Sequence, residues 1–567
     1  MYTISVSSRE GTGHLARGRA PQWDAQPMRE PVRSREMAFR SLTADRVAHT
    51  LLTVYRFRRD PRPTQTAARN GQPDLGYGDL QRPGAIGWAD PQHRFLLLLL
   101  AVGVLIFWLP RLPGSLWVDE TTTAWTVSTS FGQMLDRSVE FQSMSPTYFS
   151  LAWLARRLGG TSEIALRIPS VIAMALATYL LYRLGRRLFE AETGLIAAVV
   201  LVTSNAGAHL ATDARPYALG ILAFIAATLS LIRWVDDGRT RDGLAYLVLV
   251  ALVLYAHYIL APVLLAHVVY VWVRRHDLPS RWAVVAGGAL FALLVLPLVP
   301  IVLSTLGERE ALSLGMPHLG AVLFVILPPE VLVAMAAGIA VVAGRMRRDA
   351  DVAARDPAAL ALLWVWVAAP PIALFAITWL IGAGVLGPQH VTVSAPAVAL
   401  LAAWAIRHLA PSQVRRIVVV CMVIVSLILG NSHRQYTDDW RQAIAYANAL
   451  VVDPSTPVLV RSGLVQTSRI DWLTDAHRTP ILLAPVKAYP VDGAPVALPF
   501  GLSAAERRYL EEEVVPIAGS LSRLAVISWS IEDRVLPWLQ GRLRSTGFEL
   551  RDRRTFGSVV VAVFERA

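Results

Sequence analysis

The chain has 567 residues, of which 54% are hydrophobic and only 17% are charged. Soluble domains usually carry roughly 25% charged residues, so this composition excludes an ordinary soluble protein and indicates an integral membrane protein. The formal net charge is +12, but the arginines fall in short loops between apolar segments. That arrangement is a topology signal, and it argues against a nucleic-acid-binding surface.

Residues 1–93 are rich in arginine, with scattered proline and glycine, and they contain no apolar core. This composition predicts a largely disordered tail on the cytoplasmic side, with no cleavable signal peptide. A translation start assigned too far upstream, with Met37 as an internal start, explains the same segment equally well.

Eleven apolar segments follow this tail, several of them shorter than the roughly 20 helical residues that cross a bilayer. They are 94–110, 166–184, 190–207, 214–232, 243–257, 259–273, 281–303, 318–343, 358–383, 391–409 and 415–431. The sequence therefore predicts an α-helical polytopic membrane domain over residues 94–431, with about 11 transmembrane helices.

Arginines cluster in every second loop of this domain: Arg183, Arg186 and Arg187; Arg233, Arg239 and Arg241; Arg274, Arg275 and Arg281; Arg345, Arg347 and Arg348; and Arg407, Arg415 and Arg416. Basic loops stay on the cytoplasmic face, so the pattern puts the N-terminus inside and the end of the chain outside. Lys487 is the only lysine, a bias typical of GC-rich bacterial genes. We therefore expect a multi-pass protein of a bacterial plasma membrane.

The first outer loop, residues 111–165, is too long for a simple turn. It interleaves aromatic and charged residues, which is typical of helices lying at the membrane surface. Beyond residue 432 the pattern predicts strands at 457–460, 481–483, 524–527 and 559–563, and helices at 443–450 and 504–514. Residues 432–567 are therefore predicted to form a small extracytoplasmic α/β domain.

The first candidate site is the acidic pair Asp119 and Glu120, directly behind the first apolar segment. Ionisable groups at such a depth usually face a cavity and serve chemistry or transport. A carboxylate there suits a general base for a hydroxyl group, and partial burial would raise its proton affinity. The alternative is an acidic pair that caps the next short helix, aided by Thr121 to Thr123.

The second candidate is Arg215, at the outer end of the third and fourth segments. An arginine on the outside contradicts the loop bias, so we expect it to have an anionic partner. Its guanidinium suits a lipid phosphate, which it would hold by bidentate hydrogen bonds and stabilise as a leaving group. Pairing with Asp213 alone is the alternative.

His257 and Tyr258, at the outer junction of the fifth and sixth segments, fit either an interfacial aromatic belt or a donor lining a cavity. His390 has a similar position outside the tenth segment. No group of His, Asp and Glu has the spacing of metal ligands, so a divalent cation is unsupported. Nucleotide-binding glycine loops are absent as well, which argues against a cytosolic nucleotide-sugar or ATP site.

The order of these motifs resembles the polytopic GT-C glycosyltransferases of family 39. This group is related to dolichyl-phosphate-mannose protein mannosyltransferases and bacterial lipid-A aminoarabinose transferases. The resemblance covers about residues 94–450. It is carried by Trp117–Glu120, 145–149 with Tyr148, 165–170, 182–189, 214–219 with Arg215 and Tyr217, His257–Tyr258 and 439–441.

The resemblance implies transfer of a sugar from a polyprenyl-phosphate carrier to a glycan, lipid or protein acceptor at the outer face. It implies inversion by direct displacement, with Asp119 as base and Glu120 as its support or as an acceptor ligand. The lipid-linked sugar would be the substrate, and no cofactor is certain. The residues expected to bind substrate are Tyr148, Asp213, Arg215, Tyr217, His257, Tyr258 and His390.

Two stretches depart from the pattern of this family. Ser145 and Thr147 stand where relatives usually have a His and a second Pro, and Gln389-His390 stands where they often have Arg-Tyr. The competing function is a transporter or flippase of a lipid-linked glycan. That function expects charges inside the spans, whereas the ionisable groups here gather at the outer rim.

Overall fold

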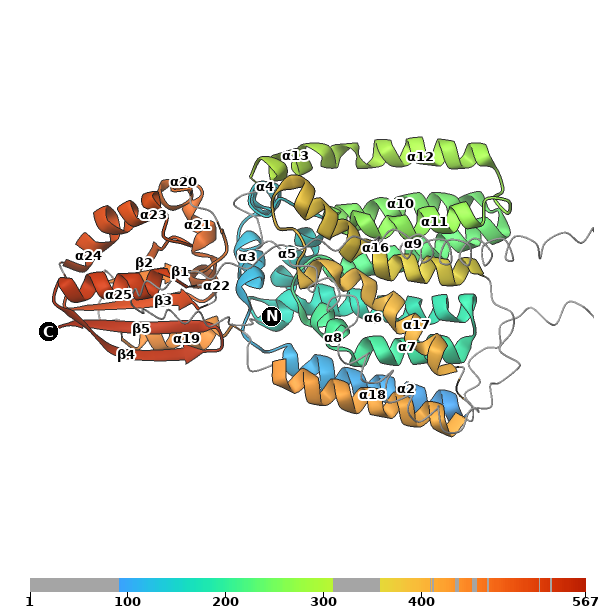
Figure 1. Ribbon diagram of the computed structural model, residues 1–567, viewed down its shortest axis with the longest axis horizontal. Helices are drawn as coiled ribbons and strands as arrows, with labels where there is room; N and C mark the ends of the chain where they lie inside the picture. Colours follow the sequence, from blue (N-terminus) through green and yellow to red (C-terminus); the bar gives the residue numbers. More distant parts are fainter. Residues whose placement is uncertain are drawn as a thin grey trace, which may run out of the picture. The chain divides into compact units, whose positions relative to one another are not determined.

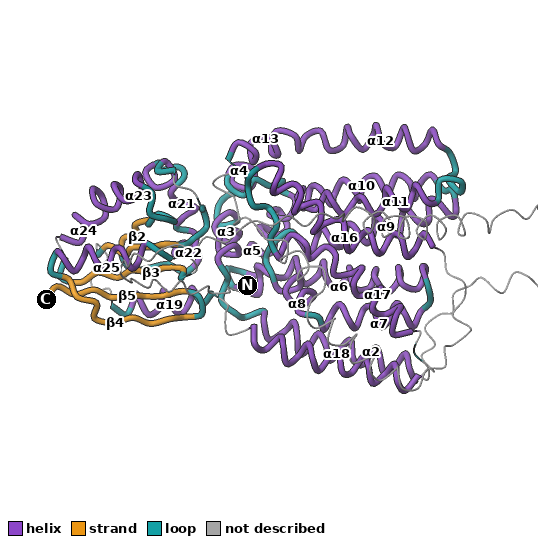
Figure 2. The backbone as a smooth tube through the Cα atoms, viewed as in Figure 1, coloured by secondary structure: helices purple, strands orange, loops and turns teal. Residues whose placement is uncertain are grey.

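The computed structural model describes residues 91–308, 357–407, 409, 412–433, 438–450, 456–466, 469–519, 521–530 and 533–567. The predicted N-terminal tail, apart from its last three residues, and the predicted apolar segment 318–343 lie outside these ranges. The helical part and the C-terminal part are traced in Figures 1 and 2.

The helical part begins with a run of helices from Pro91 to His433. They are α2 Pro91–Gly103, η1 Val104–Trp108, η2 Leu109–Arg111, α3 Val118–Thr126, α4 Phe131–Glu140, α5 Thr147–Gly159, α6 Glu163–Leu188, α7 Ala191–Thr203, α8 Asn205–Thr212, α9 Tyr217–Asp237, α10 Thr240–Ala256, η3 Tyr258–Leu264, α11 Leu265–Val273, α12 Arg281–Val295, η4 Leu296–Leu298, α13 Val299–Gly307, α16 Pro357–Ile381, η5 Pro388–Ser394, α17 Ala395–Arg407 and α18 Ser412–His433.

Six of the described helical stretches are long and apolar enough to cross a membrane, or seven if the bent pair α7 and α8 is one span. The full set of eleven stays a prediction. The predicted apolar segment 190–207 corresponds to α7 and the start of α8, and the chain bends by 68° between these two helices. Ser204 has extended backbone angles there, and its hydroxyl accepts a hydrogen bond from the Gly207 amide at 3.0 Å, which starts α8.

The arginine-rich loops lie together at one end of the helices. Arg187 after α6 and Arg274 after α11 both pair with Asp236 at the end of α9, at 2.9 and 3.0 Å. Arg415 on α18 pairs with Glu192 on α7 at 2.9 Å. These contacts place four of the five predicted clusters on one side, as the sequence predicts, and the fourth cluster lies outside the described residues.

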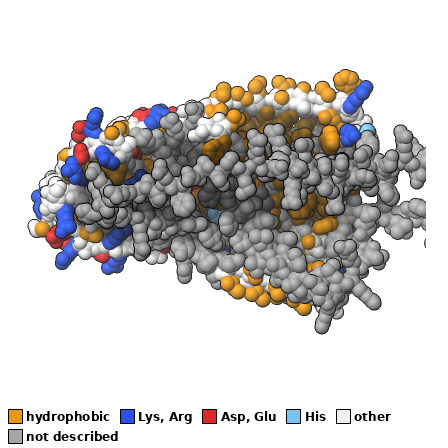
Figure 3. Space-filling model, viewed as in Figure 1, with side chains coloured by type: hydrophobic (Ala, Val, Ile, Leu, Met, Phe, Trp, Pro, Cys, Tyr) orange, Lys and Arg blue, Asp and Glu red, His pale blue; other side chains and the backbone are white. Residues whose placement is uncertain are grey.

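The core of the helical part surrounds α9. In the most apolar stretch of this helix, 72% of the residues are buried. Helices α6 and α7 pack with backbones in close contact, since a Cβ on Gly185 would lie 2.7 Å from the Cα of Gly194. By contrast, only 6% of the corresponding apolar stretch in Arg281–Gly307 is buried. Its exposed apolar side chains suit a hydrocarbon environment (Figure 3).

The C-terminal part is a five-stranded sheet with strand order β2-β1-β3-β5-β4, flanked by short helices (Figure 1). Its strands are β1 Pro457–Arg461, β2 Ala494–Ala497, β3 Arg523–Trp529, β4 Phe548–Phe556 and β5 Val559–Arg566. Its helices are α19 Trp440–Asn448, α20 Asp471–Thr474, α21 Thr479–Leu482, α22 Ala484–Ala488, α23 Ala504–Tyr509, η7 Leu510–Val514, α24 Val515–Gly519 and α25 Val535–Ser545. Strand β1 is parallel to β2 and β3, whereas β5 is antiparallel to β3 and β4.

Three of the four predicted strands coincide with β1, β3 and β5. The strand predicted over 481–483 is wrong, because Thr479–Leu482 is a helical turn with Pro480 in its first turn. Two strands were not predicted. Strand β4 lies at the sheet edge and is mostly exposed and charged, while β2 has only four residues and contains Pro495. Such strands lack the apolar alternation that predicts a strand.

Candidate active site

The acidic pair lies in the first turn of α3, and the two carboxylates have different surroundings. Glu120 is fully buried. Its carboxylate accepts hydrogen bonds from the amides of Trp117 at 3.2 Å and Ala214 at 2.8 Å, and from Nε of Arg167 at 2.7 Å. Glu120 therefore caps α3, as the structural alternative predicts, and it also ties α3 to the chain just before α9.

Arg167 on α6 explains why an ionised Glu120 is tolerated in the interior. Besides its two bonds to Glu120, its Nη1 donates to the carbonyls of Leu112 and Gly114, each at 2.8 Å. A buried charge pair needs such additional hydrogen bonds to offset desolvation. Arg167 belongs to the sequence stretch 165–170, but the sequence predicted no role for it. The available signal was a cation inside a predicted apolar segment.

Asp119, the neighbour of Glu120, is only half-buried. Within the described ranges its carboxylate accepts no hydrogen bond. Burial raises its pKa above the ordinary value; Arg215 opposes this rise, and the nearby Asp438 and Glu120 add to it. The pair is thus divided: Glu120 is buried and fully hydrogen-bonded, whereas the Asp119 carboxylate is half-buried and accepts no described hydrogen bond.

Arg215 lies beside this carboxylate and is almost fully buried, with 6% of its surface exposed. Its Nη1 donates to neutral oxygens: the backbone carbonyl of Asp119 at 3.4 Å, Oγ1 of Thr122 at 3.2 Å and Oε1 of Gln142 at 3.0 Å. Its Nε has no hydrogen-bond partner among the described residues. A buried guanidinium with an unsatisfied N–H group is costly unless it binds a ligand.

Asp213 does not supply that partner, because no ion pair joins the side chains of these two described residues. Its Oδ1 accepts a hydrogen bond from the indole of Trp117 at 2.9 Å, and its Oδ2 accepts none within the described part of the chain. Burial raises the pKa of Asp213 well above the ordinary value, and the charge of Glu120 adds to this effect. The Nε2 of His209 lies 3.6 Å from this Oδ2.

Three aromatic rings from separate elements meet near Arg215. Tyr217, at the start of α9, stacks on His257 with ring centroids 5.4 Å apart, and His390 lies about equally close to both rings. The Nδ1 of His390 must donate to the carbonyl of Val385, at 2.7 Å, because a carbonyl can only accept. In the neutral ring, Nε2 is therefore an acceptor.

The other two predicted tyrosines, Tyr148 and Tyr258, contact neighbouring elements. Tyr148 on α5 is 1% exposed, and burial raises the pKa of its hydroxyl. This hydroxyl pairs with Ser170 at 3.0 Å, and Ser170 approaches the carbonyl of Arg215 at 3.5 Å. Tyr258 donates to Thr305 at 2.9 Å. Tyr148 therefore supports the loop that carries Arg215, while Tyr258 contacts the end of α13.

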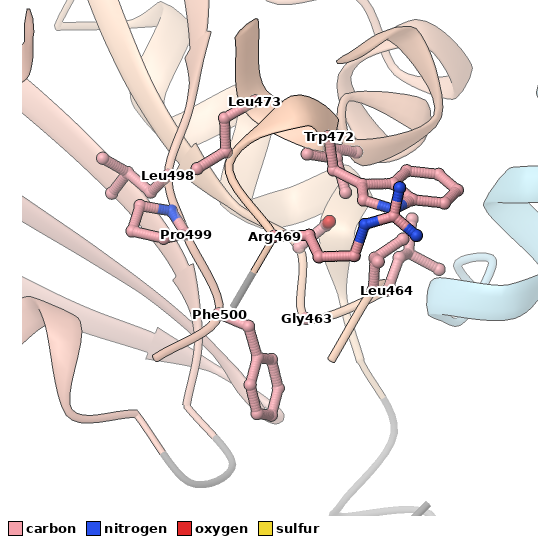
Figure 4. A pocket seen from close by; sticks show the side chains of 11 residues that line it. Gly463, Leu464, Arg469, Trp472, Leu473, Leu498, Pro499 and Phe500 are labelled. Atoms are coloured by element: carbon pink, nitrogen blue, oxygen red, sulfur yellow. The ribbon is translucent and has the colours of Figure 1, made fainter. Parts of the chain in front are cut away.

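No group of three or more described His, Cys, Asp and Glu residues has the geometry of a metal site. A separate cavity lies in the C-terminal sheet, where Gly463 follows β1 and Leu498 to Phe500 follow β2 (Figure 4). Figure 4 shows Arg469 extended beside Trp472 at its edge. Its volume of about 20 Å³ holds roughly one water molecule, which is too small for a sugar.

Comparisons with known proteins bear on these residues. Residues 143–301 match the family model of dolichyl-phosphate-mannose-protein mannosyltransferases. The apo structure of ArnT from Cupriavidus metallidurans is 12% identical, with a TM-score of 0.50, over 83% of this chain and 98% of ArnT. The family match and the shared fold indicate a GT-C glycosyltransferase.

Two further structures are more distant. ArnT bound to undecaprenyl phosphate gives a TM-score of 0.48 at 12% identity, with the same coverage of both chains. The apo oligosaccharyltransferase of Archaeoglobus fulgidus gives 0.41 at 13% identity, over 80% of this chain and 71% of that one. No curated protein sequence matches the chain.

The part of the chain that matches the family model contains Arg167, Arg215 and His257, but neither Asp119 nor His390. The fold brings together the rings of Tyr217, His257 and His390, although His390 lies outside the matched part. Sequence reasoning did not find Gln142, Thr122 or Trp117 as neighbours of these groups. Their roles depend on contacts across the loop, and nothing in their local spacing indicates them.

Proposed function

We propose that this chain transfers a sugar from a polyprenyl-phosphate carrier to an acceptor hydroxyl group, with Asp119 as general base. One observation carries the proposal. A half-buried carboxylate without a described hydrogen bond lies next to a buried guanidinium whose Nε is unpartnered. This pairing suits a reaction in which a hydroxyl loses its proton while negative charge builds on a departing phosphate.

The donor class is supported by the comparisons. The matched family takes its description from dolichyl-phosphate-mannose, and ArnT was solved bound to undecaprenyl phosphate. Both names contain a polyprenyl phosphate. We therefore infer that the donor is a sugar on such a carrier, whose apolar chain would lie among the lipid-facing helices.

The reaction is a single displacement. The acceptor oxygen attacks the anomeric carbon, and the bond from that carbon to the phosphate oxygen breaks with its electron pair. The hydroxyl proton moves to a carboxylate oxygen of Asp119, and the carrier phosphate leaves with the negative charge. One displacement inverts the anomeric carbon, so the protein needs one base and no covalent intermediate.

The remaining residues have supporting roles in this proposal. Arg215 binds the phosphate, and the buried Nε is the donor that this anion would satisfy. Glu120 and Arg167 hold the first turn of α3 rather than contact substrate. The Nε2 acceptor of His390, with Tyr217 and His257 beside it, would bind hydroxyl groups of the sugar.

The same proposal places the site at the outer face of a bacterial plasma membrane. The arginine-rich helix ends would face the cytoplasm, as would residues 1–93. Asp119 follows α2 and Arg215 lies just before α9, so both lie at helix ends opposite to those arginines. The C-terminal sheet would then be extracytoplasmic.

The test uses the purified full chain in lipid nanodiscs, with a set of radiolabelled polyprenyl-phosphate sugars and candidate glycan, lipid and peptide acceptors. Asp119→Asn should lower the transfer rate by about 10²-fold or more. Asp136→Asn, a control on the exposed surface of α4 in the same loop, should leave the rate unchanged. A parallel reaction with EDTA tests whether a divalent cation is needed.

Two results would contradict the proposal. Equal transfer by wild type and Asp119→Asn would remove Asp119 as the base. Carrier movement across a liposome bilayer, with no transfer from any donor, would support the competing function of a flippase for lipid-linked glycans.

A further inference from the structure

The first turn of α3 is held from outside the helical part by Asp438, just before α19. One carboxylate oxygen of Asp438 accepts a hydrogen bond from the Val118 amide at 3.1 Å. The other accepts from the indole of Trp529, at the end of β3, at 3.1 Å, and from the hydroxyl of Ser558, between β4 and β5. Asp438 is therefore buried between the C-terminal sheet and the residue that precedes Asp119.

This contact closes a gap in the hydrogen bonding of α3. The first amides of a helix have no partner within the helix. Glu120 accepts from the Trp117 amide, and Asp438 accepts from the Val118 amide, the next along the chain. An anionic acceptor at a helix N-terminus is favourable, since it faces the positive end of the helix dipole. Here the C-terminal part supplies it, from a position 320 residues away in the sequence.

Neighbouring residues add further contacts between α3 and the C-terminal part. The hydroxyl of Tyr489 accepts from the Leu116 amide at 2.9 Å and donates to Glu163 at 2.9 Å. Val118 and Trp125 of α3 also belong to a buried apolar cluster with residues of α19, β1 and β3. The first and last turns of α3 are thus anchored in the core of the C-terminal part.

We propose that Asp438 is a positioning residue that fixes the first turn of α3, so that the Asp119 carboxylate faces the acceptor. The inference rests on the proposed function, because it assigns Asp438 to the orientation of the proposed base. It gives the C-terminal part a role in the chemical step. A domain that only selects the acceptor would not require this contact.

The charge of Asp438 gives this role a measurable signature. The charged groups that act on Asp119 are Arg215 before α9, Glu120 on α3 and Asp438 beside the C-terminal sheet. Asp213 also interacts with Asp119. Burial raises the pKa of Asp119 first, and the negative charge of Asp438 raises it further. Removing that charge lowers the pKa of Asp119, so the base stays ionised to lower pH.

The experiment compares Asp438→Asn and Asp438→Ala in the full chain, with kcat/KM for sugar transfer measured from pH 4 to 8. Both variants should move the acid limb of the profile to lower pH. Asp438→Ala also removes the acceptor of the Val118 amide, and it should lower kcat/KM about tenfold or more, because small misplacements of a catalytic group are costly. Asp438→Asn keeps an acceptor oxygen and should lose less.

Tyr489→Phe is the matched control, because it removes the hydrogen bond to the Leu116 amide without a change of charge. It should leave the acid limb where it is in wild type. Equal losses in the tyrosine and aspartate variants, with no movement of any acid limb, would assign the effect to general loosening and overturn the proposal. Wild-type rates and acid limbs in both aspartate variants would overturn it as well.

Asp119→Asn is assayed in parallel to separate two failures. If it transfers sugar as fast as wild type, the proposed function fails at its base. If it is inactive while both Asp438 variants behave as wild type, only the positioning role fails. Should Asp438→Ala not give a monodisperse, folded protein, the acid limb of Asp438→Asn decides.

Discussion

The two ends of the helical part treat charge in opposite ways. At the arginine-rich end, Arg187 and Asp236 form an ion pair with about a third of each side chain exposed. At the other end, Arg215 and Asp213 are buried, and each keeps a polar atom that has no hydrogen-bond partner in the described ranges. Exposed pairs contribute little to stability, whereas buried unsatisfied groups are costly. Such a cost is typical of a site that a ligand completes.

Between these extremes lies the Glu120–Arg167 pair, which is as buried as the site but fully hydrogen-bonded. This pair is an example of buried charges that stabilise the fold because all their hydrogen-bonding groups have partners. The comparison therefore separates three groups of charges: paired and exposed, paired and buried, and buried with unsatisfied atoms. Each group has a different expected response to mutation.

The largest effect on stability is expected from the buried pair. Arg167→Ala leaves Glu120 as an unpaired buried charge and four loop carbonyls without their donor. We expect a loss of about 3–5 kcal/mol in unfolding free energy, measured by denaturant titration in detergent. The double variant Glu120→Gln with Arg167→Met should recover part of that loss, since no buried charge remains. No loss in the single variant would contradict the role given to this pair.

The largest effect on transfer rate, after that of the base, is expected from Arg215. Arg215→Lys keeps a positive charge but loses the planar fork that binds a phosphate bidentately. We expect kcat/KM to fall about 10²-fold, while the melting temperature changes little. Arg157→Lys, on the exposed end of α5, is the matched control and should be active. An active Arg215→Lys enzyme would show that the guanidinium geometry is not used.

How much of this contrast follows from sequence depends on how local each signal is. Arginine clusters predict helix ends, and the ion pairs confirm that four of the clusters share one side. Arg215, His257 and His390 were each predicted to bind substrate, and the structure brings the rings of His257 and His390 into contact. The break between α7 and α8 was missed, because one extended residue, Ser204, interrupts an otherwise apolar run.

The partners of the site residues could not be predicted. Glu120 and Arg167 lie 47 residues apart, and Gln142 and Arg215 lie 73 apart. The amide of Val118 finds its acceptor 320 residues later. Such pairs are set by the packing of α3 against two parts of the chain, and no local spacing encodes them. The two carboxylates are therefore equivalent in the sequence pattern, although the structure buries Glu120 and leaves Asp119 half-buried.

A smaller effect on kcat/KM is expected from a change of pH, and it tests the end of the helical part that contains Asp119 and Arg215. Burial raises the pKa of Asp119, so protonation removes the base at a higher pH than for an exposed aspartate. Below that pKa, kcat/KM should fall about tenfold per pH unit. A rate profile of the wild-type chain measures this limb. The same limb should be absent from the residual activity of Asp119→Asn, and its persistence there would assign the titration to another group.

The smallest effect is expected at the arginine-rich end. Arg187→Gln removes the exposed pair with Asp236, which Arg274 still contacts at 3.0 Å. We expect a change of about 0–1 kcal/mol in unfolding free energy and an unchanged transfer rate. The small change should shrink further at high salt, because exposed charges are screened. A loss comparable to that of Arg167→Ala would mean that exposure does not separate the two ends, since a pair in contact with water would then stabilise the fold as strongly as a buried one.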